Sequence, residues 1–266
     1  MPQYIDIAVN LVGSPLEIQL EQVIIEAQGA GVCPLIVIGS HIEESKQAIA
    51  RCQQYPKQLF STVGVHPHHA SEWTSSSSAI LTELASNNNV VAIGECGLDF
   101  NRNFSPKAAQ LEAFEAQLQL AVELDMPIYM HCRDAHSDFI ALVKKYRSQL
   151  NRAVLHCFTG SHDEMQQCID LDLYLGITGW VCDERRGTEL AEIVKHIPSN
   201  RIMLETDSPY LLPRNLQPKP KSRTNFPKYL PAIATQISAL RQESLEAFSQ
   251  QCFANSQAFF NLEHKL

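Results

Sequence analysis

Residues 127–180 contain two apolar runs of the same form, Pro127-Ile-Tyr-Met-His131-Cys and Ala153-Val-Leu-His156-Cys-Phe. Each run ends on a histidine that is followed by a cysteine and a loop. Upstream, Val90-Val-Ala-Ile-Gly-Glu95-Cys has the same form with a carboxylate in place of the imidazole, and downstream Ile202-Met-Leu-Glu-Thr-Asp207 ends on an aspartate. Four short hydrophobic runs therefore end on side chains of the kind that bind divalent metals.

Short apolar runs alternate with amphipathic segments along the whole chain. The runs predict strands at 4–11, 33–39, 59–66, 90–95, 127–131, 153–156, 173–179 and 201–207. Helical spacing of apolar residues predicts helices over 15–28, 42–54, 78–86, 106–124, 135–146, 163–171 and 188–197, and two more over 227–240 and 243–260. Eight strand–helix units in about 250 residues indicate an α/β fold, a closed (β/α)8 TIM barrel.

A doubly wound open sheet is the structural alternative to the barrel. We favour the barrel because no glycine fingerprint of the dinucleotide-binding type follows the first strand. No change of composition indicates a linker, so we expect a single domain over residues 1–266.

The composition is acidic and rich enough in apolar residues to build a full core. Of 266 residues, 45% are hydrophobic, and 21 Lys and Arg stand against 29 Asp and Glu, a formal charge of −8. This balance argues against a general electrostatic grip on nucleic acid. A polyanionic substrate must then be held by a local patch or by a metal.

The eight cysteines raise the question of disulfides and of cellular compartment. The N-terminus, Met1-Pro-Gln-Tyr-Ile-Asp, lacks the basic and apolar segments of a signal peptide. No run approaches the roughly 20 apolar residues of a membrane span. We therefore expect reduced cysteines and a cytoplasmic protein without a membrane partner. We also expect a monomer.

In such a barrel the carboxyl ends of the strands share one face, and the loops there carry the chemistry. Glu95, His131, His156 and Asp207 end the fourth, fifth, sixth and eighth predicted strands, so they converge on one mouth. A single histidine at a strand end is more often a structural residue than a ligand, but four coincidences at equivalent positions favour a metal site. A Cys-rich zinc site is the rival interpretation, which the lack of any Cys-x-x-Cys pair disfavours.

Period-two alternation predicts where the neighbouring side chains point. If the ligands of strands four to six face the mouth, the cysteine after each one, Cys96, Cys132 and Cys157, points outward as a buried packing residue. His66, at the end of the third strand, is expected to face the mouth as a phosphate donor or proton shuttle. His68 and His69 are equally consistent with plain loop residues.

Basic residues are scarce but recur after the strands on this face. Several have acidic neighbours and are expected to form surface ion pairs. The others can bind a phosphate backbone, and Phe158 and Trp180 offer stacking faces for bases. We predict Arg133 and Arg185 as substrate-binding residues; the whole basic set is Arg102, Arg133, Arg185, Arg186, Arg214, Lys219, Lys221 and Arg223.

Five motifs resemble those of a known family. They are Gly64-Val-His-Pro-His68, Ala92-Ile-Gly-Glu-Cys-Gly-Leu-Asp-Phe100, Met130-His-Cys-Arg-Asp134, Leu155-His-Cys-Phe-Thr-Gly160 and Leu204-Glu-Thr-Asp-Ser-Pro-Tyr210. Together and in this order they resemble the TatD family of metal-dependent nucleases, which are amidohydrolase-like barrels. The resemblance implies a magnesium-dependent 3′–5′ exonuclease acting on single-stranded DNA and also on RNA, with a role in the repair of oxidative DNA damage.

The end of the first strand departs from the family pattern. Family members carry a His-x-His pair there, where this chain has Ala8 and Asn10. Asn10 is a poor ligand and Ala8 is none, so these positions give no support for a second metal. The branch of the family that this chain resembles shares the loss, so the departure does not imply an inactive enzyme.

These residues suggest a mechanism. A divalent ion held by Glu95, His131 and His156 would polarise a phosphoryl oxygen and lower the pKa of a bound water. Asp207 would accept the proton or complete the coordination, and Glu205 is expected on the same side but deeper, either supporting the site or merely packing. Two imidazoles suit zinc or manganese better than magnesium, which prefers oxygen, whereas the resemblance implies magnesium.

Two other functions remain open. One is a barrel hydrolase of the amidohydrolase type that cleaves a small amide or phosphoester. It is disfavoured by the missing His-x-His pair and by a glutamate, rather than a lysine, at the end of the fourth strand. The other is a catalytically inactive metal-binding partner protein, which is disfavoured by Asp207 because such a protein needs no acid–base residue beside its metal.

Overall fold

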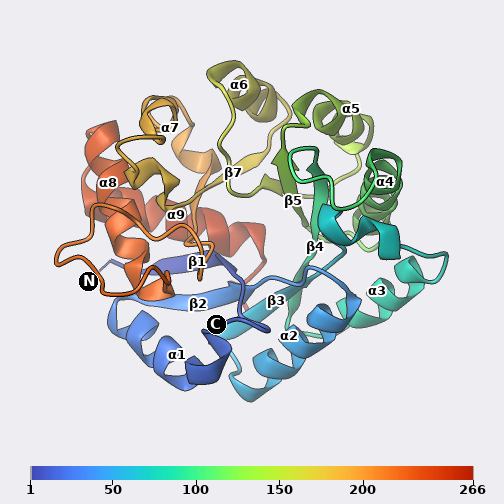
Figure 1. Cartoon of the computed structure of the whole chain (residues 1–266), viewed down its shortest axis with the longest axis horizontal. Helices are drawn as coiled ribbons and strands as arrows, with labels where there is room; N and C mark the ends of the chain where they lie inside the picture. The colour runs from blue at the N-terminus through green and yellow to red at the C-terminus, as the bar shows by residue number, and fades with distance from the viewer. Residues whose placement is uncertain (1, 266) are drawn as a thin grey trace.

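The computed structural model describes residues 2–265 and contains eight parallel strands that pair side by side in chain order. A parallel bridge between Val9 and Ser208 joins the end of the eighth strand to the first, with a 2.8 Å hydrogen bond from Asn10 N to Ser208 O. The strands therefore form a nearly closed barrel, and the helices surround it (Figure 1). The prediction of a TIM barrel is confirmed, and the open doubly wound sheet is wrong.

The strands are short, as is usual for the inner wall of such a barrel. They are β1 Tyr4–Val9, β2 Val32–Val37, β3 Leu59–Val63, β4 Val90–Asp99, β5 Ile128–Arg133, β6 Ala153–Leu155, β7 Tyr174–Ile177 and β8 Ile202–Leu204. Most of their residues are buried, because helices cover one face of the sheet and the barrel interior the other.

The helices follow the strands in the expected alternation. They are α1 Leu20–Gly29, α2 Ile42–Gln54, α3 Ser77–Ala85, α4 Lys107–Glu123, α5 His136–Tyr146, α6 His162–Asp170, α7 Thr188–Ile193, α8 Leu230–Arg241 and α9 Leu245–Phe259. Five short 3-10 turns are η1 Glu17–Gln19, η2 Pro67–Glu72, η3 Gly179–Cys182, η4 Ser199–Arg201 and η5 Pro227–Tyr229. None of the helices within residues 2–265 combines the length and apolar character that crossing a bilayer requires.

Two hydrophobic clusters stabilise the barrel. The larger lies between strands and helices, and the smaller gathers inward-facing side chains such as Ile7 and Ile36. Phe259 and Phe260 belong to the smaller cluster, so the end of α9 packs against the barrel interior. It does so where the strands begin, since Lys265 Nζ donates to the carbonyl of Asn88, just before β4. The opposite end, where the strands finish, is left to the loops.

The seam between β8 and β1 relies on a buried carboxylate. Asp6 is fully buried, and its Oδ1 accepts hydrogen bonds from the backbone N of Thr206 at 2.9 Å and of Ala8 at 3.3 Å. Thr206 Oγ1 lies 2.5 Å from Oδ2. Because β8 has only three residues, this side chain supplies acceptors that a longer strand would provide from its backbone.

Several predicted element ends differ from the structure. Among the strands the largest difference is in β4, which runs to Asp99 and not to Glu95, because β5 keeps pairing with it through Gly97 and Asp99. At the other extreme, β8 ends at Leu204, three residues before Asp207. Long-range pairing, which local sequence does not encode, decides where each strand stops.

Candidate metal centre

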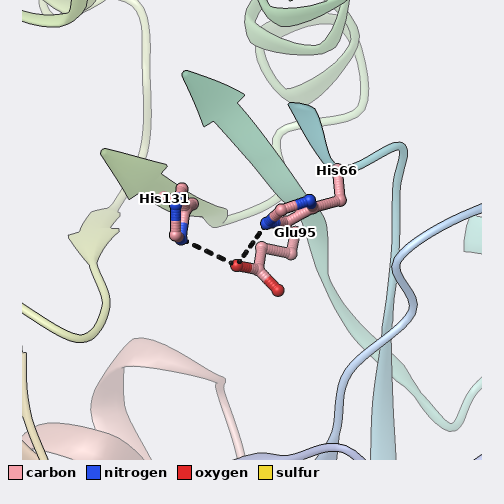
Figure 2. A group of neighbouring side chains, drawn as sticks. All are labelled: His66, Glu95 and His131. Carbon is pink, nitrogen blue, oxygen red and sulfur yellow. Dashed lines mark ion pairs between the residues drawn. The ribbon is translucent and has the colours of Figure 1, made fainter. Parts of the chain in front are cut away.

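Three imidazoles surround one carboxylate oxygen at the mouth of the barrel. Glu95 Oε1 lies 3.3 Å from His66 Nε2, 3.2 Å from His131 Nδ1 and 2.7 Å from His156 Nε2. His131 Nδ1 and His156 Nε2 are 3.4 Å apart. Figure 2 shows His66 and His131 reaching the carboxylate from two sides. Glu95, His66 and His156 are buried and His131 is half-buried, so the group opens to solvent beside His131.

Four consecutive strands supply these side chains. His66 follows β3, Glu95 lies inside β4, His131 lies inside β5 and His156 directly follows β6. The prediction that Glu95 ends its strand is therefore wrong, although its side chain still reaches the mouth. A register shift between Ile93 and Cys96 bends β4 at this point, and Glu95 N donates to the carbonyl of Gly39 at 3.1 Å.

Two glycines allow this path of β4. Gly94 and Gly97 have φ angles of +128° and +136°, which side chains with a Cβ rarely adopt. A Cβ on Gly94 would overlap the backbone oxygen of Tyr129, and one on Gly97 would overlap that of His131. The close approach of β4 and β5, which carry Glu95 and His131, depends on these two residues.

Glu205 lies beneath His156. Its side chain is fully buried, Oε1 accepts a 2.5 Å hydrogen bond from Cys157 N, and Oε2 accepts one of 3.3 Å from the Tyr129 hydroxyl. Oε2 also lies 3.6 Å from His156 Nδ1, the ring nitrogen that faces away from Glu95. The structure thus places Glu205 on the mouth side but deeper, where it can orient the imidazole; that role stays a prediction.

Asp99 and His68 are part of the site and were missed as functional residues in the sequence. Asp99 is buried, and its Oδ2 lies 2.8 Å from His68 Nε2 and 3.7 Å from His131 Nε2. Its Oδ1 accepts from the backbone N of Asn101 and Arg102 at 2.9 and 2.8 Å. Had the strand been extended past Glu95, the period of two would have placed residue 99 on the same face.

Asp207 reaches the mouth from the loop after β8. It has a φ of +54°, is half-buried, and its Oδ1 accepts a 2.8 Å hydrogen bond from Asn10 Nδ2. Loss of solvent raises the pKa of its carboxyl to about 7, although the positive charge of His156 and the Asn10 hydrogen bond oppose the rise. Asn10, at the position of the missing family histidine, therefore orients the predicted proton acceptor.

The prediction for the three cysteines holds only in part. Cys96 is buried in the main core, and Cys132 is half-buried against it. Cys157, in contrast, lines the same cavity as His156 and Asp207, so its predicted outward direction is wrong. The reason is its φ of +48°, which breaks the alternation on which the prediction relied. All eight cysteines are free thiols.

The charges in this group support one another. Burial alone would raise the pKa of Glu95, but the imidazoles of His156 and His66 hold it well below its usual range. Burial opposes protonation of His156, yet the carboxylates of Glu95 and Glu205 raise its pKa well above its usual value. Burial lowers the pKa of His66 to about 4, so this imidazole is neutral at physiological pH. The ionised Glu95 carboxylate and the imidazoles around it therefore compete for the same protons.

The donor set fits a divalent cation. Imidazole nitrogens and carboxylate oxygens are the ligands of zinc and related ions, and those of His66, Glu95 and His131 all lie within 4.8 Å of one another. The outer nitrogens of His131 and His156 lie 3.7 and 3.6 Å from the carboxylates of Asp99 and Glu205, on the side where metal-binding histidines usually meet a supporting carboxylate. Within residues 2–265, neither outer nitrogen has a hydrogen-bond partner.

A cavity of about 870 Å³ surrounds this group. His66, Glu95, His131, His156 and Asp207 all line it, together with Arg102 and Arg133. Within the described chain, neither arginine side chain takes part in an ion pair or hydrogen bond. The cavity therefore combines the candidate ligands with two unpaired positive charges.

Arg185, predicted to bind substrate, lies elsewhere. Its guanidinium donates to both carboxylate oxygens of Asp183 at 3.2 Å, and it does not line the central cavity. Arg186 bonds to the same carboxylate and also covers the ring of Trp180, with its guanidinium carbon 4.5 Å from the ring centroid. The two predicted basic contacts are thus separated: only Arg133 faces the mouth.

The predicted stacking residues line a smaller neighbouring cavity. Phe158 and Trp180 border a space of about 310 Å³, together with Arg133 and Arg186. Phe158 is 3% exposed and belongs to the main core, and Trp180 is half-buried beneath Arg186. Neither ring presents a free face to the larger cavity, and their contact with bases stays a prediction.

The chain is similar to a known family over nearly its whole length. The sequence pattern of the family described as TatD related DNase matches residues 5–261. A protein of Pectobacterium atrosepticum named 3′-5′ ssDNA/RNA exonuclease TatD is 51% identical over 257 residues, which cover 97% of this chain and 99% of that one. One of the same name from Erwinia billingiae is 49% identical, over 97% of this chain and 98% of that one.

Solved structures agree with this similarity. A TatD family hydrolase of Entamoeba histolytica superposes with a TM-score of 0.86 at 28% identity, covering 97% of this chain and 98% of that one. A TatD homologue of Escherichia coli gives a TM-score of 0.87 at 25% identity with the same coverage. A phosphotriesterase homology protein of Escherichia coli, at 15% identity and a TM-score of 0.67, shares the fold alone. Because the family pattern matches residues 5–261 and relatives about 50% identical align over 97% of the chain, this protein belongs to the family of TatD-related DNases.

Proposed function

We propose that this protein is a metal-dependent exonuclease that removes nucleotides from the 3′ end of single-stranded DNA and of RNA. The observation that carries the proposal is the convergence of His66, Glu95, His131 and His156 in one cavity with two unpaired arginines. Membership in a DNase family and the names of relatives at about 50% identity support the substrate class.

Each residue of the centre has a proposed role. Glu95, His131 and His156 hold the divalent cation, and Asp207 completes the set or stands beside it. His66 Nε2, 3.3 Å from Glu95 Oε1, is close enough to serve as a further ligand. Glu205 and Asp99 orient the imidazoles of His156 and His131.

The protein residues position the substrate and move the proton. A bound divalent cation supplies Lewis-acid polarisation of a phosphoryl oxygen and acidifies a water molecule. Asp207, whose pKa lies about 7, accepts the proton from the attacking water at its carboxylate oxygens. Arg102 and Arg133 hold the phosphate and balance its charge as the P–O bond breaks, and the proton taken up by Asp207 passes to the departing oxygen.

Magnesium is the proposed metal for the assay, and we propose that manganese or zinc binds the site more tightly. Imidazole donors favour manganese and zinc over magnesium, which keeps an oxygen-rich shell. Ala8 and Asn10 supply no histidine for a second ion on the β1 side, so we propose one cation per site.

Release of mononucleotides from a 3′-ended single strand tests the proposal. Wild type with Mg²⁺ or Mn²⁺ should shorten a 5′-labelled oligonucleotide one nucleotide at a time, and chelation should stop it. Glu95→Gln keeps the volume and removes the charge, so it should abolish release, whereas Glu43→Gln on the exposed face of α2 is the matched control. A wild type that leaves DNA and RNA intact but hydrolyses a small amide or ester would refute the nuclease and favour the amidohydrolase alternative.

The cellular setting is part of the proposal. We propose a cytoplasmic monomer, with residues 1–266 acting as one catalytic domain, that trims damaged 3′ ends after oxidative stress. A deletion strain should lose viability in peroxide and regain it with wild type but not with Glu95→Gln. Equal survival of all three strains would separate the repair role from the enzymatic activity.

A further inference from the structure

Two exposed aromatic side chains stand at the mouth of the barrel. Among residues 2–265, the large hydrophobic side chains with high exposure are Ile18, Ile25, Phe104 and Tyr210. Phe104 is 68% exposed and Tyr210 is 60% exposed, and both line the cavity that holds the candidate ligands. Ile18 and Ile25 lie on η1 and α1 and do not line it. Exposure of aromatic rings is costly in water, so its restriction to this mouth points to a ligand.

The two rings come from opposite sides of the barrel. Phe104 lies in the loop after β4, and Tyr210 lies in the loop after β8. Since the eight strands pair in chain order around the barrel, β4 and β8 are half a turn apart. The candidate ligands, which lie in or just after β3 to β6, and Asp207 line the same cavity. A nucleic-acid strand that crosses the metal centre can therefore contact one aromatic ring on each side of this centre.

Each of the two aromatic residues has one contact that holds it in place. The ring of Phe104 contacts that of His68, with centroids 4.7 Å apart and planes at 66°, and His68 in turn bonds to Asp99. Tyr210 is fixed by its backbone, whose N donates to the carbonyl of Asp207 at 2.9 Å. Within the described chain the Tyr210 ring has no aromatic or cationic partner.

The surrounding charges suit a nucleic-acid strand. Arg102 precedes Phe104 by two residues and lines the same cavity, as does Arg133. Unpaired guanidinium groups beside exposed rings are the combination that binds a single strand, with cations on the phosphates and rings on the bases. Phe158 and Trp180, in contrast, are buried in the core or covered by Arg186.

We propose that Phe104 and Tyr210 are the base-stacking contacts of this enzyme, each holding one unpaired nucleobase on either side of the scissile phosphate. One ring holds the base of the 3′-terminal nucleotide that leaves, and the other holds the base on the 5′ side. Stacking accepts any base but requires an unstacked one, so the pair selects single strands without selecting sequence. This inference rests on the proposed nuclease function.

Protein variants combined with abasic substrates test which ring holds which base. The variants are Phe104→Ala and Tyr210→Ala, with Phe104→Trp and Tyr210→Phe as conservative partners and Ile25→Ala as the matched control for loss of an exposed hydrophobic side chain. The substrates are one oligonucleotide with all its bases and two that lack the base of the terminal or of the penultimate nucleotide. Rates of first-nucleotide release give KM and kcat, and thermal unfolding confirms that each variant is folded.

On the intact strand each alanine variant should raise KM by roughly 5- to 150-fold, the range of one base–aromatic stack, with kcat nearly unchanged. Each should lose this effect on one of the two abasic strands, and not the same one. The conservative variants and Ile25→Ala should behave as wild type. An alanine variant with unchanged KM, or with an equal defect on all three strands, would overturn the inference, whereas a wild type that degrades no strand would overturn the nuclease itself.

Discussion

Replacement of Asp6 by asparagine should make the stability of the protein less dependent on pH. Asp6 is fully buried at the β8–β1 seam, where burial raises the pKa of its carboxyl to about 8 although three hydrogen bonds oppose the rise. The protonated acid can donate from Oδ2 to Thr206 Oγ1, 2.5 Å away, while Oδ1 still accepts from the backbone. Asparagine has the same shape and donates at the same position, so Asp6→Asn resembles the protonated form.

The sign and size follow from linkage. Below the ordinary aspartate pKa of about 4, folded and unfolded chains both hold the proton, and Asp6 gives no pH dependence. Above it the unfolded chain releases the proton while the folded chain retains it, up to about pH 8. The free energy of unfolding should therefore fall by about 1.4 kcal/mol per pH unit on account of this group, or about 2.7 kcal/mol between pH 5 and pH 7.

Urea unfolding of the wild type and Asp6→Asn at pH 5, 6, 7 and 8, with a chelator present throughout, measures this difference. The variant should gain stability relative to wild type by about 2.7 kcal/mol as the pH rises from 5 to 7. The difference between the proteins isolates Asp6, because the histidines and other acids titrate in both. Asp163→Asn, whose side chain is 96% exposed, is the control and should not change the slope. Parallel curves for Asp6→Asn and wild type would show that Asp6 is ionised in the folded protein and refute the reasoning.

Three further outcomes are expected. Gly97→Ala should lower the free energy of unfolding by about 2–5 kcal/mol, because alanine is strained at a φ of +136° and its Cβ would overlap the backbone oxygen of His131. Circular dichroism melts would measure the loss, and an unchanged melt would mean that β4 relaxes freely. Manganese at 100 times its Kd should raise the free energy of unfolding of the wild type by about 2.7 kcal/mol and that of Glu95→Gln hardly at all. An equal increase in both proteins, measured by urea unfolding, would place the cation elsewhere. Arg102→Ala should reduce the slope of log affinity against log salt concentration, measured for a single strand, by about 0.7. Arg185→Ala should leave the slope unchanged, because Arg185 is already paired with Asp183. Equal slopes for Arg102→Ala and wild type would exclude Arg102 from phosphate binding.

Much of the site could be located from sequence because strand ends are local features. The apolar runs that end on Glu95, His131 and His156 identified three side chains that the structure brings within 3.4 Å of one another. The repeat of strand and helix then placed those ends on a common face. Asp207 was found in the same way, although it lies in a loop beyond the end of β8.

Other parts of the site depend on geometry that no local pattern carries. Asp99 joins the centre because β5 keeps pairing with β4 beyond Glu95, and Cys157 turns into the mouth because of its positive φ. Pairing length and left-handed residues depend on neighbours that are distant in sequence, so period-two alternation failed at both places.

The sequence by itself determined the barrel and the candidate metal ligands at its mouth, since hydrophobic periodicity and residue type are properties of short segments. Only the tertiary structure decided which cations and rings are free to meet a substrate. Arg185 has suitable chemistry but is paired with Asp183, and Phe158 is buried in the core. Arg102 and Phe104, in contrast, line the cavity. Whether a side chain is available depends on what packs against it, and those partners meet only when the barrel closes.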